Sequence, residues 1–164
     1  GDIHLAARNN DANQFAIFIN DVNSYMSANS STKFYGLTLG DLAWDQYWID
    51  NKYDLTNYMK DIAKVNTMVF NTIGNHDHEQ LAAGDFSTVE VYKKVVCPTY
   101  YSFNIGKIHY VSIDDIECTN NGTGSRTYNT KVVNEVLDWL AKDIAMIGKD
   151  TPVVISMHSP VETN

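Results

Sequence analysis

Short apolar runs in this chain end in side chains that can bind metal ions, and this pattern constrains the fold more than any other feature. The runs 34–39, 67–73 and 152–156 each end this way, and a similar group opens the chain. The groups concerned are Asp2, His4, Asp41, Asn75, His76, Asp77 and His158. In open α/β sheets, ligands bind beyond the carboxyl ends of the strands. The sequence therefore predicts that these groups converge on one site.

The order of these motifs resembles the calcineurin-like metallophosphoesterase family. The motifs are Asp-x-His at 2–4, Gly-Asp at 40–41, Gly-Asn-His-Asp at 74–77 and a single histidine, His158, after a strand. The paired-strand pattern at 100–114 is similar to that family as well, and so is the helix that carries Asp138-Trp139-Leu140. The resemblance covers nearly the whole chain. It implies an α/β fold, a metallophosphoesterase-type β-sandwich flanked by helices.

The resemblance also implies a dinuclear metal site and a role for each ligand. Asp2 and His4 would hold the first ion, Asn75 and His158 would hold the second, and Asp41 would bridge the two. Mixed carboxylate, imidazole and amide ligands suit Mn, Fe or Zn. Two such divalent ions, about 3.5–4 Å apart, hold the phosphate and turn a bound water into hydroxide. The implied reaction is hydrolysis of a phosphate mono- or diester with metal-bound hydroxide as nucleophile.

His76 is the motif histidine that the family does not use as a ligand. The resemblance implies that it protonates the leaving oxygen as a general acid. Asp77 follows it directly, and a carboxylate partner can orient a histidine and raise its basicity. We therefore expect Asp77 to support His76 in catalysis.

Two parts of the family pattern are missing from these 164 residues. One is the strand before Asp-x-His, and the other is a later Gly-His-x-His segment that supplies one histidine to each metal. We therefore expect 1–164 to be a single catalytic-domain fragment, incomplete at both ends, whose parent chain has further domains. Each metal would keep three protein ligands, so we expect weak metal binding and little hydrolysis by the fragment alone.

The composition indicates which kinds of partner the chain is expected to bind. A hydrophobic share of 44% and a charged share of 20% are typical of a globular domain. The net charge of −8 argues against a broad basic surface for nucleic acid, and no apolar run approaches the roughly 18 residues of a membrane span. We expect neither partner, and expect metals to offset the charge for a phosphate-ester substrate. The alternatives are a non-catalytic scaffold of the same fold and a nuclease of the same superfamily.

Apolar spacing and turn residues predict the secondary structure. Helices are expected at 11–29, with Asp11 as its cap, and at 51–65, 87–96 and 129–147, and strands at 33–39, 67–73, 100–105, 107–114 and 152–157. The segment 120–125 is expected to be a flexible loop, because Asn, Gly and Ser dominate it. This alternation of strands and helices indicates a layered α/β architecture.

The remaining candidates have less specific interpretations. Cys97 and Cys118 are either two free thiols or a disulfide. His109 fits a structural role, and His78, Asp114 and Asp115 fit solvated, turn or supporting roles. The rings that follow Asp41 predict core packing, a lid, or a wall for an apolar or sugar-bearing leaving group; they are Trp44, Tyr47, Trp48 and Tyr53. Lys and Arg are scarce near the motifs, so the sequence indicates no phosphate clamp.

Overall fold

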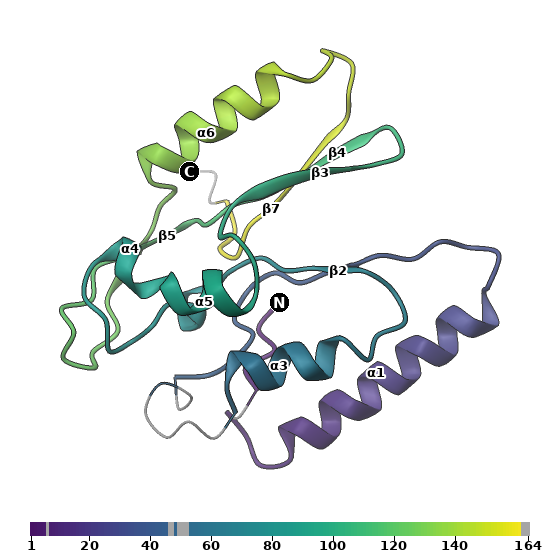
Figure 1. Cartoon of the computed structure of the whole chain (residues 1–164), viewed down its shortest axis with the longest axis horizontal. Helices are drawn as coiled ribbons and strands as arrows, with labels where there is room; N and C mark the ends of the chain where they lie inside the picture. The colour runs from purple at the N-terminus through teal and green to yellow at the C-terminus, as the bar shows by residue number, and fades with distance from the viewer. Residues whose placement is uncertain (6, 46–47, 49–52, 162–164) are drawn as a thin grey trace.

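The computed structural model describes residues 1–5, 7–45, 48 and 53–161, which form a mixed α/β arrangement with three small sheets (Figure 1). The helices are α1 (Asp11–Ala28), α3 (Leu55–Ile62), α4 (Asp85–Thr88), α5 (Glu90–Val95) and α6 (Asn134–Ala145), with the 3₁₀ turn η1 (Asn75–Asp77). The strands are β1 (Gly36–Leu37), β2 (Val69–Phe70), β3 (Tyr101–Ile105), β4 (Ile108–Ser112), β5 (Ile116–Cys118), β6 (Tyr128–Thr130) and β7 (Val153–Ser156).

The sheets combine parallel and antiparallel pairs. β1 pairs in parallel with β2, and β5 pairs antiparallel with β6. In the largest sheet β4 lies between β3, which is antiparallel to it, and β7, which is parallel to it. The β3–β4 hairpin confirms the paired strands expected at 100–114. Because β1, β2 and β7 each enter a parallel pair, their carboxyl ends are where a common site can form.

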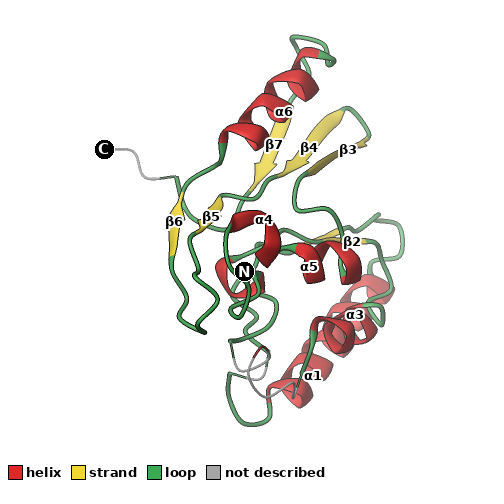
Figure 2. Ribbon diagram, turned by 60° about the vertical axis from the view of Figure 1, so that its left-hand side comes forward, coloured by secondary structure: helices red, strands yellow, loops and turns green. Residues whose placement is uncertain are grey.

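Two apolar cores hold the layers together. The first packs α1, α3 and α5 around the N-terminal segment and the loops after β1 and β2; its buried residues are Leu5, Phe15, Ile19, Leu42, Ala43, Trp48, Leu55, Tyr58, Ile62, Ile73, Val89 and Tyr92. The second lies between β4 and α6, around Val111, Ile113 and Val136. Figure 2 shows α6 along the three-stranded sheet, with α1 and α3 at the other end of the molecule. No helix in the described ranges combines the length and apolar character needed to cross a membrane.

The expected helix at 129–147 is wrong at its start. Residues 128–130 form β6, which pairs with Ile116–Cys118, and the helix begins only at Asn134. Val132 and Val133 pack on the second core in the segment between them. The apolar spacing that suggested an earlier start comes from this packing, and the β5–β6 pairing is non-local, so periodicity cannot reveal it.

Other boundaries differ by smaller amounts. The helix at 87–96 is divided into α4 and α5 at Val89, and the strand expected at 33–39 is regular only over Gly36–Leu37. Asp11 is the first residue of α1 and not its cap: its carboxylate accepts from the backbone N–H of Arg8. Asp54 caps α3 by accepting from Asn57 N at 2.7 Å, whereas the expected start of that helix, 51–52, lies outside the described residues.

Both cysteines are free thiols, Cys97 partly buried and Cys118 buried. Of the two alternatives for this pair, the structure therefore has the free thiols and not the disulfide.

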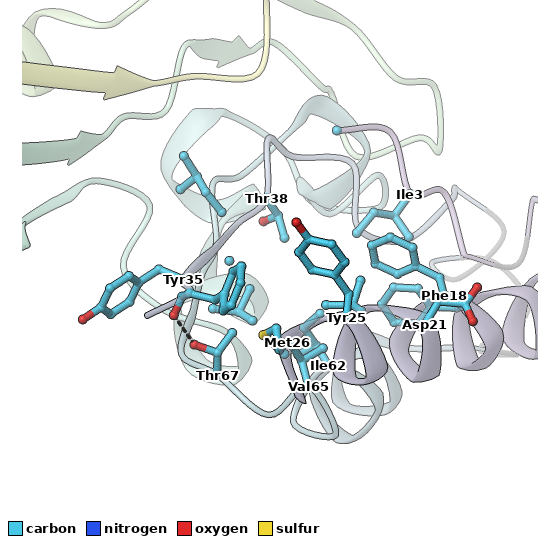
Figure 3. Close-up of a pocket in the computed structure, with 17 residues that line it drawn as sticks. Ile3, Phe18, Asp21, Tyr25, Met26, Tyr35, Thr38, Ile62, Val65 and Thr67 are labelled. Atoms are coloured by element: carbon cyan, nitrogen blue, oxygen red, sulfur yellow. Dashed lines mark hydrogen bonds between the residues drawn. The ribbon is translucent and has the colours of Figure 1, made fainter. Parts of the chain in front are cut away.

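A cavity of about 790 Å³ lies between α1 and the β1–β2 pair (Figure 3). Phe18, Tyr25 and Met26 line it from α1, and Ile62 and Val65 line it from α3 and the turn that follows. Phe18 is 56% exposed here, although the helix pattern predicts it on the packed face with Phe15. The lining is mostly apolar, with Asp21, Thr38 and Thr67 among its polar side chains, and none of the expected metal ligands lines it.

Candidate metal centre

Four segments that are distant in sequence meet at the carboxyl ends of β1, β2 and β7. The N-terminal segment runs beside the loop after β1: Asp2 N donates to Gly40 O at 3.1 Å and His4 N donates to Asp41 O at 2.9 Å. The loop after β2 becomes η1, and the chain after β7 carries His158 to the same place. Figure 1 shows the N-terminus and the end of β7 together near the middle of the molecule.

Two glycines allow these loops to approach so closely. Gly40 has φ +82°, and a Cβ on it would lie 2.7 Å from Gly74 Cα and 2.8 Å from His158 Nδ1. A Cβ on Gly74 would lie 2.3 Å from the backbone nitrogen of Asp41. Any side chain at either position would collide with the neighbouring loop, which explains the glycine in both motifs.

The Asp41 carboxylate is the centre of the cluster, and its side chain is only 4% exposed. Its Oδ2 lies 2.8 Å from His4 Nε2, 3.4 Å from His158 Nε2 and 3.9 Å from His76 Nε2. Its Oδ1 accepts from the backbone N–H of His76 at 2.9 Å. Three imidazole rings therefore share one carboxylate oxygen. Asp2 is at the open side: it is 66% exposed, with its Oδ1 3.9 Å from His4 Nε2.

The His158 ring lies between two acceptors, the carbonyl oxygen of Leu39 and the carboxylate of Asp41, with the side-chain amide of Asn75 beside it. Its Nδ1 is 2.8 Å from the carbonyl oxygen of Leu39, so Nδ1 carries the proton. Its Nε2 faces the Asp41 carboxylate and lies 2.9 Å from Asn75 Oδ1. A neutral ring in this tautomer directs its Nε2 lone pair at the Asp41 carboxylate, 3.4 Å away, an arrangement that requires positive charge between the two. A metal ligated by Nε2, with Nδ1–H on a backbone carbonyl, meets that requirement.

Backbone conformation supports the same conclusion. Asp2, His4 and Asp41 have φ of +55°, +49° and +54°, in the left-handed region that L-residues rarely adopt. Each such residue costs roughly 1–3 kcal/mol and persists where the surroundings enforce it, often at functional sites. Three of the four described non-glycine residues with positive φ are therefore expected ligands; the fourth, Asn10, precedes α1.

The donor set therefore fits divalent metal ions. Two groups have their ligand atoms all within 4.8 Å of one another: His4, Asp41 and His76, and Asp2, Asp41 and His158. Asp41 belongs to both, as a bridging ligand must. The expected ligands Asp2, His4, Asp41, Asn75 and His158 are thus brought together, but the two groups divide them differently from the expected sets, since Asp2 falls with His158 and His4 falls with His76. His76, expected to be the acid, lies at ligand distance as well.

His76 has a carboxylate partner, but it is not the expected one. Asp45 Oδ1 lies 2.8 Å from His76 Nδ1. Trp44 stacks on the same ring, with centroids 4.3 Å apart and planes 27° from parallel. Such a ring face stabilises an imidazolium. The Asp45 side chain is partly buried, which raises the pKa of its carboxyl, but hydrogen bonds from His76 and Arg126 outweigh this and lower that pKa.

Asp77 was expected to orient His76, and that contact is wrong. Its Oδ1 accepts from the backbone N–H of Leu42 at 2.8 Å and of Ala43 at 3.3 Å, and its Oδ2 accepts from Gly74 N at 2.9 Å. Burial, and then the charge of Asp41, raise the pKa of Asp77 to about 7. Asp77 braces the loop after β1 against the loop after β2. The side chain next to His76 in sequence points away from its ring because the 3₁₀ turn directs successive side chains to different sides.

Sequence reasoning missed Asp45 and Arg126. The two form an ion pair, with Arg126 Nη2 2.6 Å from Asp45 Oδ1. Asp45 follows Asp41 by four residues, but this spacing does not show that its carboxylate reaches the ring of His76. Arg126 carries no local signal, because it follows the turn-rich segment 120–125 and reaches the site only through the fold. Of the expected aromatic wall, Trp44 contacts His76 and Trp48 donates from Nε1 to His76 O at 2.9 Å, while Tyr47 lies outside the described residues.

The other polar candidates support the site or the fold. Asp115 accepts from the backbone N–H groups of His158 and Ser159 at 3.0 and 2.8 Å, and so holds the loop after β7. His78 is fully buried, which excludes its solvated interpretation; it lies 3.4 Å from Asp114 and 2.9 Å from Thr88.

Compared with protein-family models and with curated protein sequences, the chain matches none. The family resemblance therefore depends on the four motifs and on the site they build.

Proposed function

We propose that this chain is the catalytic part of a metal-dependent phosphoesterase, with the β-sandwich fold of the calcineurin-like metallophosphoesterases. The observation that carries the proposal is the convergence of four motif segments on the buried carboxylate of Asp41, with imidazole nitrogens and acceptor oxygens directed at one another. A cluster of this kind needs positive charge at its centre, and divalent ions would supply it.

In this proposal Asp2 and His4 hold one ion, Asn75 and His158 hold the other, and Asp41 contacts both. When bound, two such ions bind phosphate oxygens and lower the pKa of water, which is the chemistry that hydrolysis of a phosphate mono- or diester requires. The strained backbone at Asp2, His4 and Asp41 favours this function over a non-catalytic scaffold, which would have no use for the strain. The acidic balance of the chain disfavours the nuclease alternative.

His76 is the proposed general acid. Its Nδ1 is occupied by Asp45, so its Nε2 is the nitrogen that faces Asp41 and can deliver a proton to a leaving oxygen. Asp45 stabilises the protonated ring and the face of Trp44 does the same. Trp44 also borders the space beside His76, where the leaving group would lie. Positioned acids of this kind accelerate reactions by about 10²–10⁴-fold.

The test begins with metal binding to residues 1–164. Titration with Mn²⁺ and Zn²⁺ followed by calorimetry is expected to show binding that a chelator reverses. Hydrolysis of p-nitrophenyl phosphate and bis(p-nitrophenyl) phosphate by these residues is expected to be slow, because each ion has only three protein ligands, and to be measurable only at saturating metal. His158→Gln is expected to weaken the binding by about 10-fold or more, and the control His109→Gln, which alters a buried histidine on β4, to leave it unchanged. A wild-type protein that binds neither metal would overturn the proposal.

A further inference from the structure

The motif loop that carries His76 is held by an arginine from a distant part of the chain. We infer that Arg126 is a positioning residue for His76, which it acts on by fixing the Asp45 carboxylate and the backbone on both sides of the ring. The inference deepens the proposed function, because it assigns control of the proposed acid to the loop between β5 and β6.

The first contact is with the partner of the ring. Arg126 Nε donates to Asp45 Oδ1 at 2.8 Å, and Nη2 lies 2.6 Å from the same oxygen. That oxygen is also the one 2.8 Å from His76 Nδ1. The guanidinium and the imidazole therefore meet at one carboxylate oxygen. The Arg126 side chain is only 8% exposed, so this charge pair is shielded from water.

The second contact is with the backbone of the motif loop. Arg126 Nη1 donates to the carbonyl oxygen of Asn75, and Nη2 donates to that of His78 at 3.1 Å. These two carbonyls lie before and after His76. The carbonyl of His76 itself accepts from Trp48 Nε1 at 2.9 Å. The backbone that orients the His76 ring is thus held at three carbonyl groups, those of Asn75, His76 and His78.

Arg126 is itself placed by contacts that do not involve the site. Gln80 Nε2 donates to Gly124 O at 2.5 Å, and Asn120 Nδ2 donates to Glu79 O at 3.2 Å. Asn120 also accepts from Thr127 N at 2.8 Å, next to Arg126. These bonds fasten the β5–β6 loop onto the segment after η1. The loop expected to be flexible at 120–125 is therefore a fixed support for the guanidinium.

Arginine suits this position because its planar guanidinium presents several N–H donors in fixed directions. All three of its nitrogens already donate to protein oxygens and the side chain is only 8% exposed, which favours a positioning role for Arg126 over a role as a phosphate ligand. The consequence is specific: Arg126 acts on the orientation and tautomer of the His76 ring. Loss of Arg126 is expected to lower kcat while KM stays close to its original value.

The experiment compares Arg126→Ala and Arg126→Lys with the control Lys131→Ala, which removes a cation from the Glu117 pair on the neighbouring strand. The first readout is the histidine ring ¹⁵N–¹H spectrum of the metal-free protein at one pH. Wild type is expected to show His76 with its proton on Nδ1, and Arg126→Ala is expected to lose that single state. Lys131→Ala is expected to retain it. Arg126→Lys is not expected to restore it, because a point charge cannot make the fork of contacts.

The second readout is hydrolysis at saturating Mn²⁺. Arg126→Ala is expected to lower kcat by about 10–100-fold, the usual cost of losing a group that orients an active-site residue. The loss is expected to grow as the leaving group becomes poorer, since the proton from His76 then matters more. A change in KM with kcat unchanged would overturn the inference.

The ring spectrum separates failure of this inference from failure of the proposed function, because it requires neither metal nor substrate. A folded Arg126→Ala protein with an unchanged His76 signal overturns the positioning role, even if wild type hydrolyses phosphate esters. If Arg126→Ala does not fold, Asp45→Asn tests the same connection from its other side, and an unchanged His76 ring in that variant overturns it equally. Wild type without metal binding overturns the proposed function and leaves the ring result to stand alone.

Discussion

Two clusters in this molecule combine histidine with aspartate, and they are built differently. One surrounds Asp41 at the ends of β1, β2 and β7. The other surrounds Asp143 of α6, where His109 Nε2 lies 2.7 Å from Oδ2 and Ser102 Oγ donates to Oδ1 at 2.7 Å. Both carboxylates are largely buried, at 3% and 7% exposure. Residue types and burial alone do not distinguish them.

The partners do distinguish them. In the Asp143 cluster each group has a partner of its own: the second ring nitrogen of His109 faces the Asn104 amide at 3.0 Å, and an amide can turn its N–H toward a ring. Asn104 and His109 are directly opposite in the β3–β4 ladder. In the Asp41 cluster three rings surround one carboxylate oxygen, and His158 lies between the Leu39 carbonyl and that carboxylate, neither of which is an amide that can turn an N–H toward the ring.

The backbone distinguishes them as well. Asp143 sits in a regular helix and His109 in a regular strand, whereas Asp2, His4 and Asp41 have left-handed φ values. A polar cluster that serves the fold satisfies its groups without strain, and one that serves a ligand leaves charge unbalanced until the ligand arrives. The contrast identifies the Asp41 cluster as the functional candidate and the Asp143 cluster as a joint between α6 and its sheet.

The largest expected effect comes from replacing each of the two carboxylates by an amide, in two separate variants. Asp41→Asn is expected to abolish metal-dependent hydrolysis and to weaken metal binding by more than about 100-fold, because an amide is a poor bridge between two cations. Asp143→Asn is expected to leave both unchanged. Calorimetric titration with Mn²⁺ and a chromogenic phosphodiester assay measure the two properties. Equal losses in both variants would remove the distinction between the clusters.

The next effect separates acid from ligand within the Asp41 cluster. His76→Gln is expected to retain metal and to lose about 10²–10⁴-fold in rate, most strongly for esters with poor leaving groups. The comparison variant is His4→Gln, which is expected to lose metal. Rates for a series of substituted phenyl phosphates, with metal content measured on the same samples, distinguish them. Loss of metal in His76→Gln would make His76 a ligand, as its distance from Asp41 allows.

The third effect is on the free energy of unfolding, and here the larger loss is expected for the Asp143 cluster. Asp143→Ala leaves the His109 ring and the Ser102 hydroxyl without their buried acceptor, and a buried polar group that loses its hydrogen-bond partner typically costs about 1–3 kcal/mol. Urea unfolding is expected to show this loss in metal-free protein. The control Asp138→Ala changes an exposed residue of the same helix and is expected to fall within about 0.5 kcal/mol of wild type. A similar loss in both would show that helix α6, and not the His109 contact, is being measured.

The sequence predicted the site better than it predicted the elements around it. The metal-ligand candidates could be named because each follows an apolar run or lies in a short motif, and motifs are local. The regular strands are shorter than the apolar runs, as at Gly36–Leu37, because the other residues of each run lie in loops and make packing contacts there. The start of α6 was misplaced because β6 depends on pairing with a strand ten residues or more away.

The errors within the site have a different cause. Asp77 was expected to support His76 because it is adjacent in sequence, but adjacent residues in a 3₁₀ turn point in different directions. The true partner, Asp45, comes from the loop after β1, and Arg126 comes from beyond β5. Spacing within one motif carries no information on such contacts, since they are fixed by how the loops pack. The convergence of the candidate ligands could be predicted from the sequence, whereas their supporting partners required the fold.

The last prediction concerns His78, a buried histidine whose contacts, like those of His109, serve the fold. Thr88 donates its hydroxyl to Asp85 O at 2.7 Å, so it can only accept from His78 Nδ1, while His78 Nε2 faces Asp114. Both nitrogens then carry protons. Burial lowers the pKa of His78, but hydrogen bonds to Asp114 and Cys118 outweigh it and raise that pKa to about 9.

As pH rises, the unfolded chain loses its proton at His78 near the ordinary histidine pKa of about 6.5, whereas the folded protein keeps that proton to higher pH. The stabilisation is complete below about pH 6.5 and is lost as pH increases to about 9, at up to about 1.4 kcal/mol per pH unit. Urea unfolding between pH 6 and 9 measures the slope, which His78→Gln is expected to remove. Cys118→Ser separates the thiol, whose pKa the same ring lowers, from the Asp114 pair. A slope that survives in His78→Gln would assign the proton to another group and leave His78 neutral.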